Sequence, residues 1–192
     1  MRPLVRALDA LLRWAQGVEA FDEDERCILR IQLAHASRPL NFPNGMVKRG
    51  EPVILLHLWN ERIPPMPPQG ADVEWAARMK RLFIHSLRAL AQAMRREARL
   101  GKARAIGGAT VLVASADGSD GSRLVQQLGF TILPYSHRLG RFAEFWENLY
   151  SWWLMWTYNP ATLRRRKFLH LRRAEIWMPT EEFLRRYGSA ET

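Results

Sequence analysis

The chain has 192 residues, of which 47% are hydrophobic and 25% are charged, and these values indicate a globular protein and exclude a disordered one. This length suits one domain that buries a proper core. The single cysteine, Cys27, excludes an intramolecular disulfide framework and a multi-cysteine zinc site. The formal charge of +10 indicates attraction to polyanions such as anionic lipid, nucleic acid or a phosphorylated ligand.

The first residues predict an amphipathic helix. Leu4, Leu8, Leu11 and Leu12 recur at helical spacing, and Gly17 ends the pattern. Charges interrupt this segment, so it does not resemble a signal peptide. No stretch reaches the roughly 18 uncharged apolar residues that a membrane-spanning helix needs. We therefore expect a cytoplasmic protein that is soluble or peripheral on the inner face of the cell membrane.

Two strands follow, separated by turns. The segment "RCILRIQLAH" alternates, which places Cys27, Leu29, Ile31 and Leu33 on one face of a strand. The turn dipeptides Asn44-Gly45 and Arg49-Gly50 come next, with the short segment "MVK" between them. The next strand, "PVILLHLWN", is apolar on both faces, which predicts a central position in the sheet.

The remaining elements alternate between helices and strands. After the loop "IPPMPPQGA", apolar residues at three- and four-residue intervals predict a long helix from Asp72 to about Leu100 with arginines on its outer side. A strand with the pair Gly107-Gly108, a short helix and a short strand come next. A helix over 142–157 precedes a strand "RRAEIWMP" and a last helix that Thr180 is expected to cap.

This order predicts one α+β domain over residues 1–192. We expect a single mixed, mainly antiparallel sheet of about five to six strands, flanked by helices. An N-terminal helix occupies residues 1–20, and an aromatic and basic peripheral segment occupies 141–170. The pair Gly107-Gly108 indicates a bulge or a place where a ligand or backbone approaches closely, and packing against the long helix is the equal alternative.

The best candidate for a catalytic cluster is "HLWNERIPP". His57 shares a strand face with Leu55 and Trp59, and the polar side chains of Asn60, Glu61 and Arg62 follow at the strand end. Such a position, opening onto a loop, is typical of sites in open sheets, and His57 or Glu61 would act as a general base there. The alternative is a hydrogen-bonded core histidine beside a surface ion pair. The chain's five histidines show no metal-binding spacing, and we expect neither a metal nor a resident cofactor.

The stretch "FWENLYSWWLMWTYNPATLRRRK" is the most unusual in the chain, because four of the eight tryptophans fall within it. Its aromatic residues form a broad helical stripe, and a basic run follows. Consecutive large residues cover most of the helix circumference, so one domain face cannot bury them all. The residues proposed for a membrane or partner surface are Trp146, Trp152, Trp153, Trp156, Arg164, Arg165, Arg166 and Lys167.

The sequence leaves several alternatives for what covers the aromatic helix. Border tryptophans and adjacent arginines favour an anionic membrane surface. A protein partner, a second copy of the chain in a homodimer, the N-terminal helix or the interior of the domain are alternatives. Nucleic acid is an unlikely partner of the protein, because stacking platforms intersperse isolated aromatics with basic residues, whereas here the aromatics are massed together and the basic run is separate.

The chain resembles the YkoP-like proteins in "VILLHLWNERIPP", the long helix, "GGATVL", "LVQQLGF" and "AEIWMPTEEFLRRYG". This resemblance extends from about Arg26 to Gly188. It implies a bacterial protein without an established activity, and a link to the cell envelope, because some members are joined to or encoded beside polysaccharide-deacetylase-like proteins. The chain lacks a deacetylase metal motif, so that activity is not carried over.

The element order also resembles the GNAT acyltransferase core, with "RLVQQLGFTILP" similar to its helix before the acceptor-side strand. That resemblance implies an acyl-CoA-dependent N-acyltransferase as the alternative function. The loop that opens the long helix reads "PPMPPQGADVEW" and contains one glycine, Gly70, among prolines without amide donors. The pyrophosphate-binding loop of that superfamily is therefore degenerate in this chain.

Overall fold

The computed structural model describes residues 2–110, 120–135, 140–158, 160 and 174–189. Within these ranges a mixed five-stranded sheet has the order β1-β4-β5-β7-β6. Its only parallel pair is β4 with β5, and the other three pairs are antiparallel. The strands are β1 (Leu29–His35), β4 (Pro52–Leu58), β5 (Ala105–Thr110), β6 (Thr131–Pro134) and β7 (Ala174–Pro179). The predicted α+β class with one mixed, mainly antiparallel sheet is confirmed.

The central position predicted for "PVILLHLWN" is also confirmed, because β4 lies between β1 and β5. Its two sides contact different parts of the protein. Ile54, Leu56 and Leu58 pack into the main core, whereas Val53 and Leu55 pack into a second cluster on the other face. This apolar character on both sides is what an interior strand covered on both faces requires.

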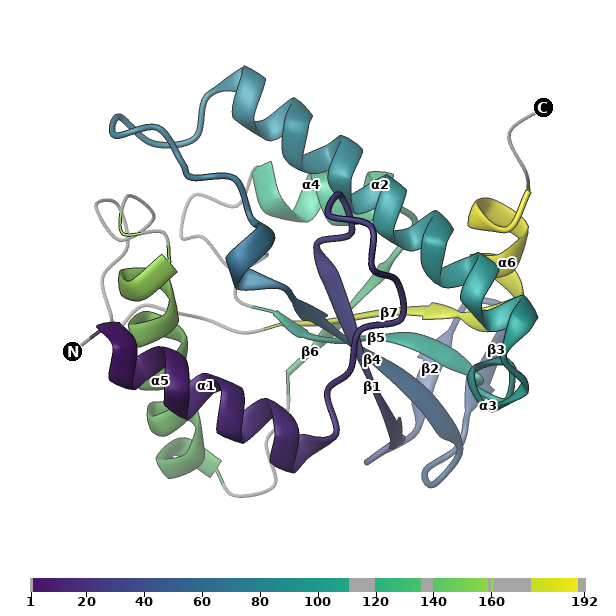
Figure 1. The fold of residues 1–192 in the computed structure, drawn as a ribbon. Coiled ribbons are helices and arrows are strands. Elements are labelled where there is room, and N and C mark those ends of the chain that lie inside the picture. The colour runs from purple at the N-terminus through teal and green to yellow at the C-terminus, as the bar shows by residue number, and fades with distance from the viewer. Residues whose placement is uncertain (1, 111–119, 136–139, 159, 161–173, 190–192) are drawn as a thin grey trace.

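Three helices cover the first face of the sheet and form the main core with it (Figure 1). Leu87, Leu90 and Met94 of the long helix pack with Leu29 and Ile31 of β1, in keeping with the predicted apolar stripe. Cys27 is fully buried in this core, as a small apolar residue would be. The helices are α2 (Val73–Arg96), α4 (Asp120–Gln127) and α6 (Thr180–Tyr187).

The second face carries two groups of elements. A hairpin that the sequence did not predict, β2 (Leu40–Phe42) with β3 (Gly45–Val47), packs on Trp177 of β7 through Leu40 and Val47. Near the other end of the sheet, α1 (Arg2–Gln16) crosses α5 (Gly140–Tyr158), and α5 contacts the short helix η1 (Asn60–Arg62) (Figure 1). The sheet thus separates α2 from the pair formed by α1 and α5.

Three details differ from the sequence prediction. The long helix ends at Arg96, because Glu97 has extended dihedral angles before the short helix α3 (Ala98–Gly101) begins. Thr180 does not cap α6 with its side chain; it is the first helical residue, and its hydroxyl donates to the Ala103 carbonyl at 2.7 Å. Leu33 is 41% exposed rather than packed with Leu29 and Ile31, since it lies toward the end of an edge strand.

Gly107 accommodates a close approach from β7, whereas the nearest neighbour of Gly108 is Leu56 of β4. A Cβ at Gly107 would lie 2.0 Å from the Ile176 carbonyl oxygen and 2.7 Å from the Trp177 ring. Gly108 has a φ of +147°, which side chains rarely adopt. The absence of a side chain at Gly107 lets the large indole of Trp177 lie against the neighbouring strand.

Candidate functional site

His57, the first of the predicted catalytic residues, lies on the second face of the sheet. Alternation along β4 places it on the side of Leu55, and its Nε2 is 3.0 Å from the Gln32 Oε1 on β1. Burial lowers the pKa of His57, because an imidazolium is poorly solvated there. The imidazole is therefore neutral near pH 7 and chemically able to accept a proton.

Arg62 is held by backbone carbonyl groups. Its guanidinium donates to the carbonyls of Asp24 at 2.6 Å and Cys27 at 3.2 Å, which ties η1 to the segment before β1. The same group lies 3.5 Å from the centroid of the Trp59 ring, and Arg30 lies 3.9 Å from that ring's centroid. Two cations therefore stack on one indole, an arrangement that fixes the path of the chain after β4.

Glu61 belongs to a polar junction between α1, α5 and η1. Arg13 of α1 bridges two carboxylates, at 2.9 Å from Glu61 Oε1 and 2.9 Å from Asp9 Oδ2. Burial opposes ionisation of Glu61, but hydrogen bonds from its own backbone and from Arg13 lower its pKa. The carboxylate of Glu61 is thus ionised and engaged in holding α1.

Asp9 completes this junction and is 2% exposed. The hydroxyl of Tyr150 on α5 donates to Asp9 Oδ1 at 2.5 Å, and that of Tyr158 lies 3.5 Å from Oδ2. Burial, followed by the adjacent carboxylate, raises the pKa of Tyr150. Sequence reasoning missed Asp9, Arg13 and Tyr150; an acid and an arginine four residues apart within an apolar helix were the available signal.

The four residues of the predicted cluster therefore have separate surroundings. His57 pairs with Gln32 on the sheet, Glu61 binds Arg13 of α1, and Arg62 binds carbonyls before β1. Asn60 begins η1 and is half-buried. These contacts account for Glu61 and Arg62 as fold-stabilising residues, and a catalytic role for the cluster stays a prediction.

The aromatic helix is partly covered by α1. Trp153 is 36% exposed, and Trp152 and Trp156 are half-buried. The side chain of Trp146 and the basic residues Arg164, Arg165, Arg166 and Lys167 lie outside the described residues. The described indoles are therefore not all enclosed by the chain.

Several large apolar side chains of α1 are exposed. Trp14 is 80% exposed and Leu11 is 58% exposed, and Leu8 is exposed as well. We call Leu8, Leu11, Trp14 and Trp153 the apolar surface of α1 and α5. Among residues 7–16 of α1, whose side chains the structure describes, Asp9 is buried and Arg13 is half-buried, while Leu8, Leu11 and Trp14 are exposed. This part of α1 is therefore inverted relative to an ordinary surface helix.

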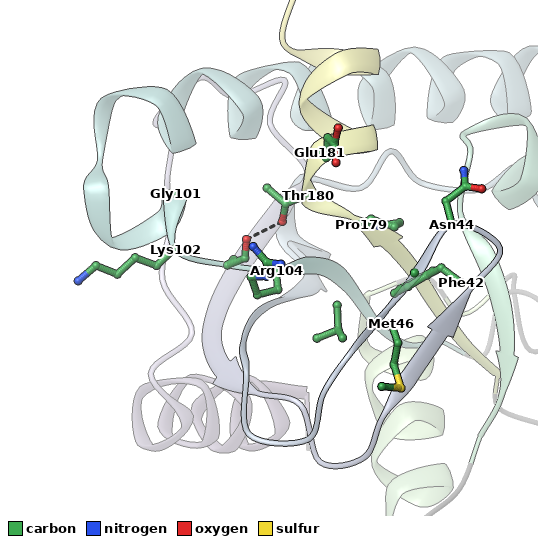
Figure 2. A pocket seen from close by; sticks show the side chains of 12 residues that line it. Phe42, Asn44, Met46, Gly101, Lys102, Arg104, Pro179, Thr180 and Glu181 are labelled. Atoms are coloured by element: carbon green, nitrogen blue, oxygen red, sulfur yellow. Dashed lines mark hydrogen bonds between the residues drawn. The ribbon is translucent and has the colours of Figure 1, made fainter.

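A hollow of about 520 Å³ lies between the β2–β3 hairpin, the segment 101–104 and the start of α6 (Figure 2). Phe42, Met46 and Pro179 supply apolar walls. Figure 2 shows Lys102 pointing away from the other lining residues, so its charge does not converge with that of Arg104. A ligand site needs convergent polar groups; Lys102 adds none here, and the Thr180 hydroxyl is engaged by the Ala103 carbonyl.

The start of α2 offers little support for binding a pyrophosphate. The Asp72 side chain accepts a hydrogen bond from the Trp75 amide at 2.7 Å, and Glu74 adds a second acid in the first turn. The Asp72 carboxylate occupies the place where an anion would bind, and the negative charges of both carboxylates would repel that anion. An acyl-CoA requirement therefore stays a prediction of the GNAT resemblance.

Two kinds of feature are absent from the residues that the structure describes. No group of three or more histidine, cysteine or acidic side chains there is arranged to hold a metal ion. No helix in the same part of the chain combines the length and apolar character needed to cross a bilayer.

Comparison with known proteins identifies a family but not an activity. No curated protein and no solved structure shows significant similarity to the chain. The model of the YkoP domain matches residues 1–187, which includes the central strand, η1, the long helix and the last helix. The chain therefore belongs to the YkoP domain family.

Proposed function

We propose that this YkoP-domain protein binds the surface of an anionic membrane through α1 and α5, and works there with envelope polysaccharide or lipid machinery. The observation that carries the proposal is the inverted orientation of α1. A helix that buries Asp9 and leaves Trp14 80% exposed keeps apolar area in water at a cost of about 25 cal/mol per Å². Exposed apolar residues grouped in this way mark interaction surfaces.

The composition of the surface favours a lipid interface. Indole rings prefer the level of the lipid headgroups, and Trp14 and Trp153 both belong to the exposed set. Leu8 and Leu11 add aliphatic side chains that reach into the acyl boundary. The formal charge of +10 attracts the protein to an anionic leaflet, where each nearby cation contributes about 1 kcal/mol.

Vesicle flotation tests this proposal. Wild-type protein is mixed with neutral vesicles and with vesicles containing about a third phosphatidylglycerol, and the floated fraction is measured. We expect flotation with the anionic vesicles and a large loss in the double variant Leu11→Ser/Trp14→Ser. The control, Met46→Ser/Val73→Ser, removes two exposed apolar side chains elsewhere and is expected to float like the wild type.

The same samples also distinguish a membrane from the other candidates for covering the apolar surface, namely a second copy of the chain and a protein partner. Concentration-dependent dimerisation that Leu11→Ser/Trp14→Ser abolishes, without vesicle binding, would assign the surface to a second copy of the chain. A monomer that floats with neither vesicle type would refute membrane binding and would assign the apolar surface to a protein partner. Equal flotation with neutral and anionic vesicles would refute the electrostatic contribution.

A further inference from the structure

The outer side of α2 carries a line of exposed arginines, which we call the arginine stripe: Arg78, Arg81, Arg88, Arg95 and Arg96. Arg81, Arg88 and Arg95 are seven residues apart, which is close to two helical turns, so they lie almost in line along the helix axis. From Arg78 to Arg95 the stripe extends for about 26 Å at 1.5 Å per residue.

Few acidic groups neutralise the stripe. Glu74, in the first turn, is the only acid of α2. Within the part of the chain that the structure describes, no carboxylate forms an ion pair with Arg78, Arg81, Arg95 or Arg96. Nearby His85 and Arg99 do have acidic partners, Asp24 and Glu19 respectively. Four of the five arginines of the stripe therefore have no carboxylate partner among the described residues, in contrast to these two neighbours.

We propose that the arginine stripe binds the phosphate backbone of double-stranded nucleic acid without reading its sequence. Charge complementarity is strongest with a duplex, which carries about one negative charge per 1.7 Å of axis. All five members are arginine, whose planar guanidinium suits bidentate contact with phosphate oxygens. The proposal concerns a different surface from the one that we assign to the membrane.

The residues beside the stripe distinguish a duplex from two other polyanionic surfaces. The other exposed positions of α2 are Val73, Glu74, Ala76, Lys80 and Gln92, and none of them is an aromatic side chain on which the bases of a single strand would stack. No large apolar side chain accompanies the stripe beyond Val73 at the helix start, so nothing there inserts into a bilayer. In addition, α2 lies across the sheet from α1 and α5 (Figure 1).

The test compares two variants of the full chain with the same net charge. Arg78→Gln/Arg81→Gln/Arg95→Gln/Arg96→Gln changes the stripe, and Lys48→Gln/Arg49→Gln/Lys102→Gln/Arg104→Gln changes four exposed cations elsewhere. Each lowers the formal charge from +10 to +6 by removing four positive charges. Fluorescence anisotropy with a labelled duplex of about 20 base pairs, across a range of salt concentrations, gives the Kd and its salt dependence.

We expect the stripe variant to bind the duplex at least about tenfold more weakly, with a log–log salt slope shallower by about 0.9 for each phosphate that the variant no longer neutralises. The control variant is expected to keep most of the wild-type slope. The wild type should bind the duplex more tightly than the corresponding single strand, and poly-L-glutamate at equal charge should displace it poorly.

Three results would overturn the proposal: no duplex binding at about 50 mM salt, where such contacts are strongest; equal weakening in both variants, which would reflect net charge alone; or efficient displacement by poly-L-glutamate, which would indicate an acidic protein partner. Vesicle flotation of the stripe variant separates the two proposals. If the stripe variant floats like the wild type, the membrane-binding proposal stands whether or not the duplex binds.

Discussion

The guanidinium group of Arg62 connects η1 to the segment before β1 through carbonyl groups at 2.6 and 3.2 Å. Lysine at this position keeps the charge but supplies one point donor in place of a planar fork. We expect Arg62→Lys to lower the free energy of unfolding by about 1–3 kcal/mol, because buried carbonyls lose their partners. Urea denaturation measures the change, and Arg49→Lys at an exposed turn position should change little. Equal stability of the two variants would contradict a structural role for Arg62.

His57 makes stability depend on pH in a definite direction. Burial lowers its pKa in the folded protein below the ordinary value of 6.5, so the unfolded chain binds the proton more readily. Its contribution to stability is therefore complete above about pH 6.5 and declines as the pH falls below that value. We expect the free energy of unfolding to decrease between pH 7 and pH 5, and to decrease less in His57→Gln.

Asp24 also makes stability depend on pH, but in a lower pH range than His57. A hydrogen bond from the Arg26 side chain, followed by one from its backbone, lowers the pKa of Asp24. Stability linked to Asp24 is thus present above its ordinary pKa near 3.8 and is lost only at lower pH. Identical pH profiles for wild type and His57→Gln between pH 7 and pH 5 would show that His57 does not titrate as inferred.

At the scale of elements, α1 is attached mainly by polar contacts. Tyr150 donates to the buried Asp9 at 2.5 Å, and Arg13 joins that carboxylate to Glu61. Tyr150→Phe leaves one oxygen of a buried carboxylate without its donor, which costs about 1–3 kcal/mol. We expect the α1 amides to exchange hydrogen roughly tenfold or more faster while those of α2 are unchanged, as mass spectrometry can measure.

Tyr158→Phe is the matched control for this attachment. The Tyr158 hydroxyl is 3.5 Å from the Asp9 oxygen, so its hydrogen bond is weaker and its removal should accelerate exchange much less. If exchange in α1 is the same in both variants, the attachment of α1 does not depend on the contact between Asp9 and Tyr150.

Periodicity predicted most elements because burial repeats with the geometry of the backbone. The alternation in "RCILRIQLAH" and the helical repeat of Leu87, Leu90 and Met94 both appear in the main core. Element ends were less predictable, since they depend on contacts distant in sequence. Thr180 resembles a helix cap, but the carbonyl of Ala103, 77 residues earlier, takes its hydroxyl instead.

The candidate site shows the same limit. Sequence placed His57, Glu61 and Arg62 near a strand end, and the structure agrees. It could not show that Arg13 would reach Glu61 across 48 positions or that Tyr150 would reach Asp9 across 141. An amphipathic pattern also does not state which side faces inward, and only these long-range partners make the polar side of α1 the buried one.

The whole molecule presents two chemically different sides, because the sheet lies between the arginine stripe of α2 and the apolar surface of α1 and α5 (Figure 1). A protein bound to a membrane through the second side holds the first side away from the lipid. The charge of +10 alone would not orient the molecule. A defined orientation of the protein on the bilayer therefore distinguishes binding through the apolar surface from non-specific electrostatic adsorption.

Quenching of tryptophan fluorescence by brominated lipids measures this orientation. Trp14 lies on the apolar surface, whereas Trp75 is in the first turn of α2 and donates to the Pro64 carbonyl at 3.1 Å. We expect Trp14→Phe to remove a substantial part of the quenching that anionic brominated vesicles cause in the wild type. Trp75→Phe should leave the quenched component unchanged, because that indole is directed away from the bilayer. A greater loss of quenching in Trp75→Phe would mean that the protein binds lipid through the opposite side.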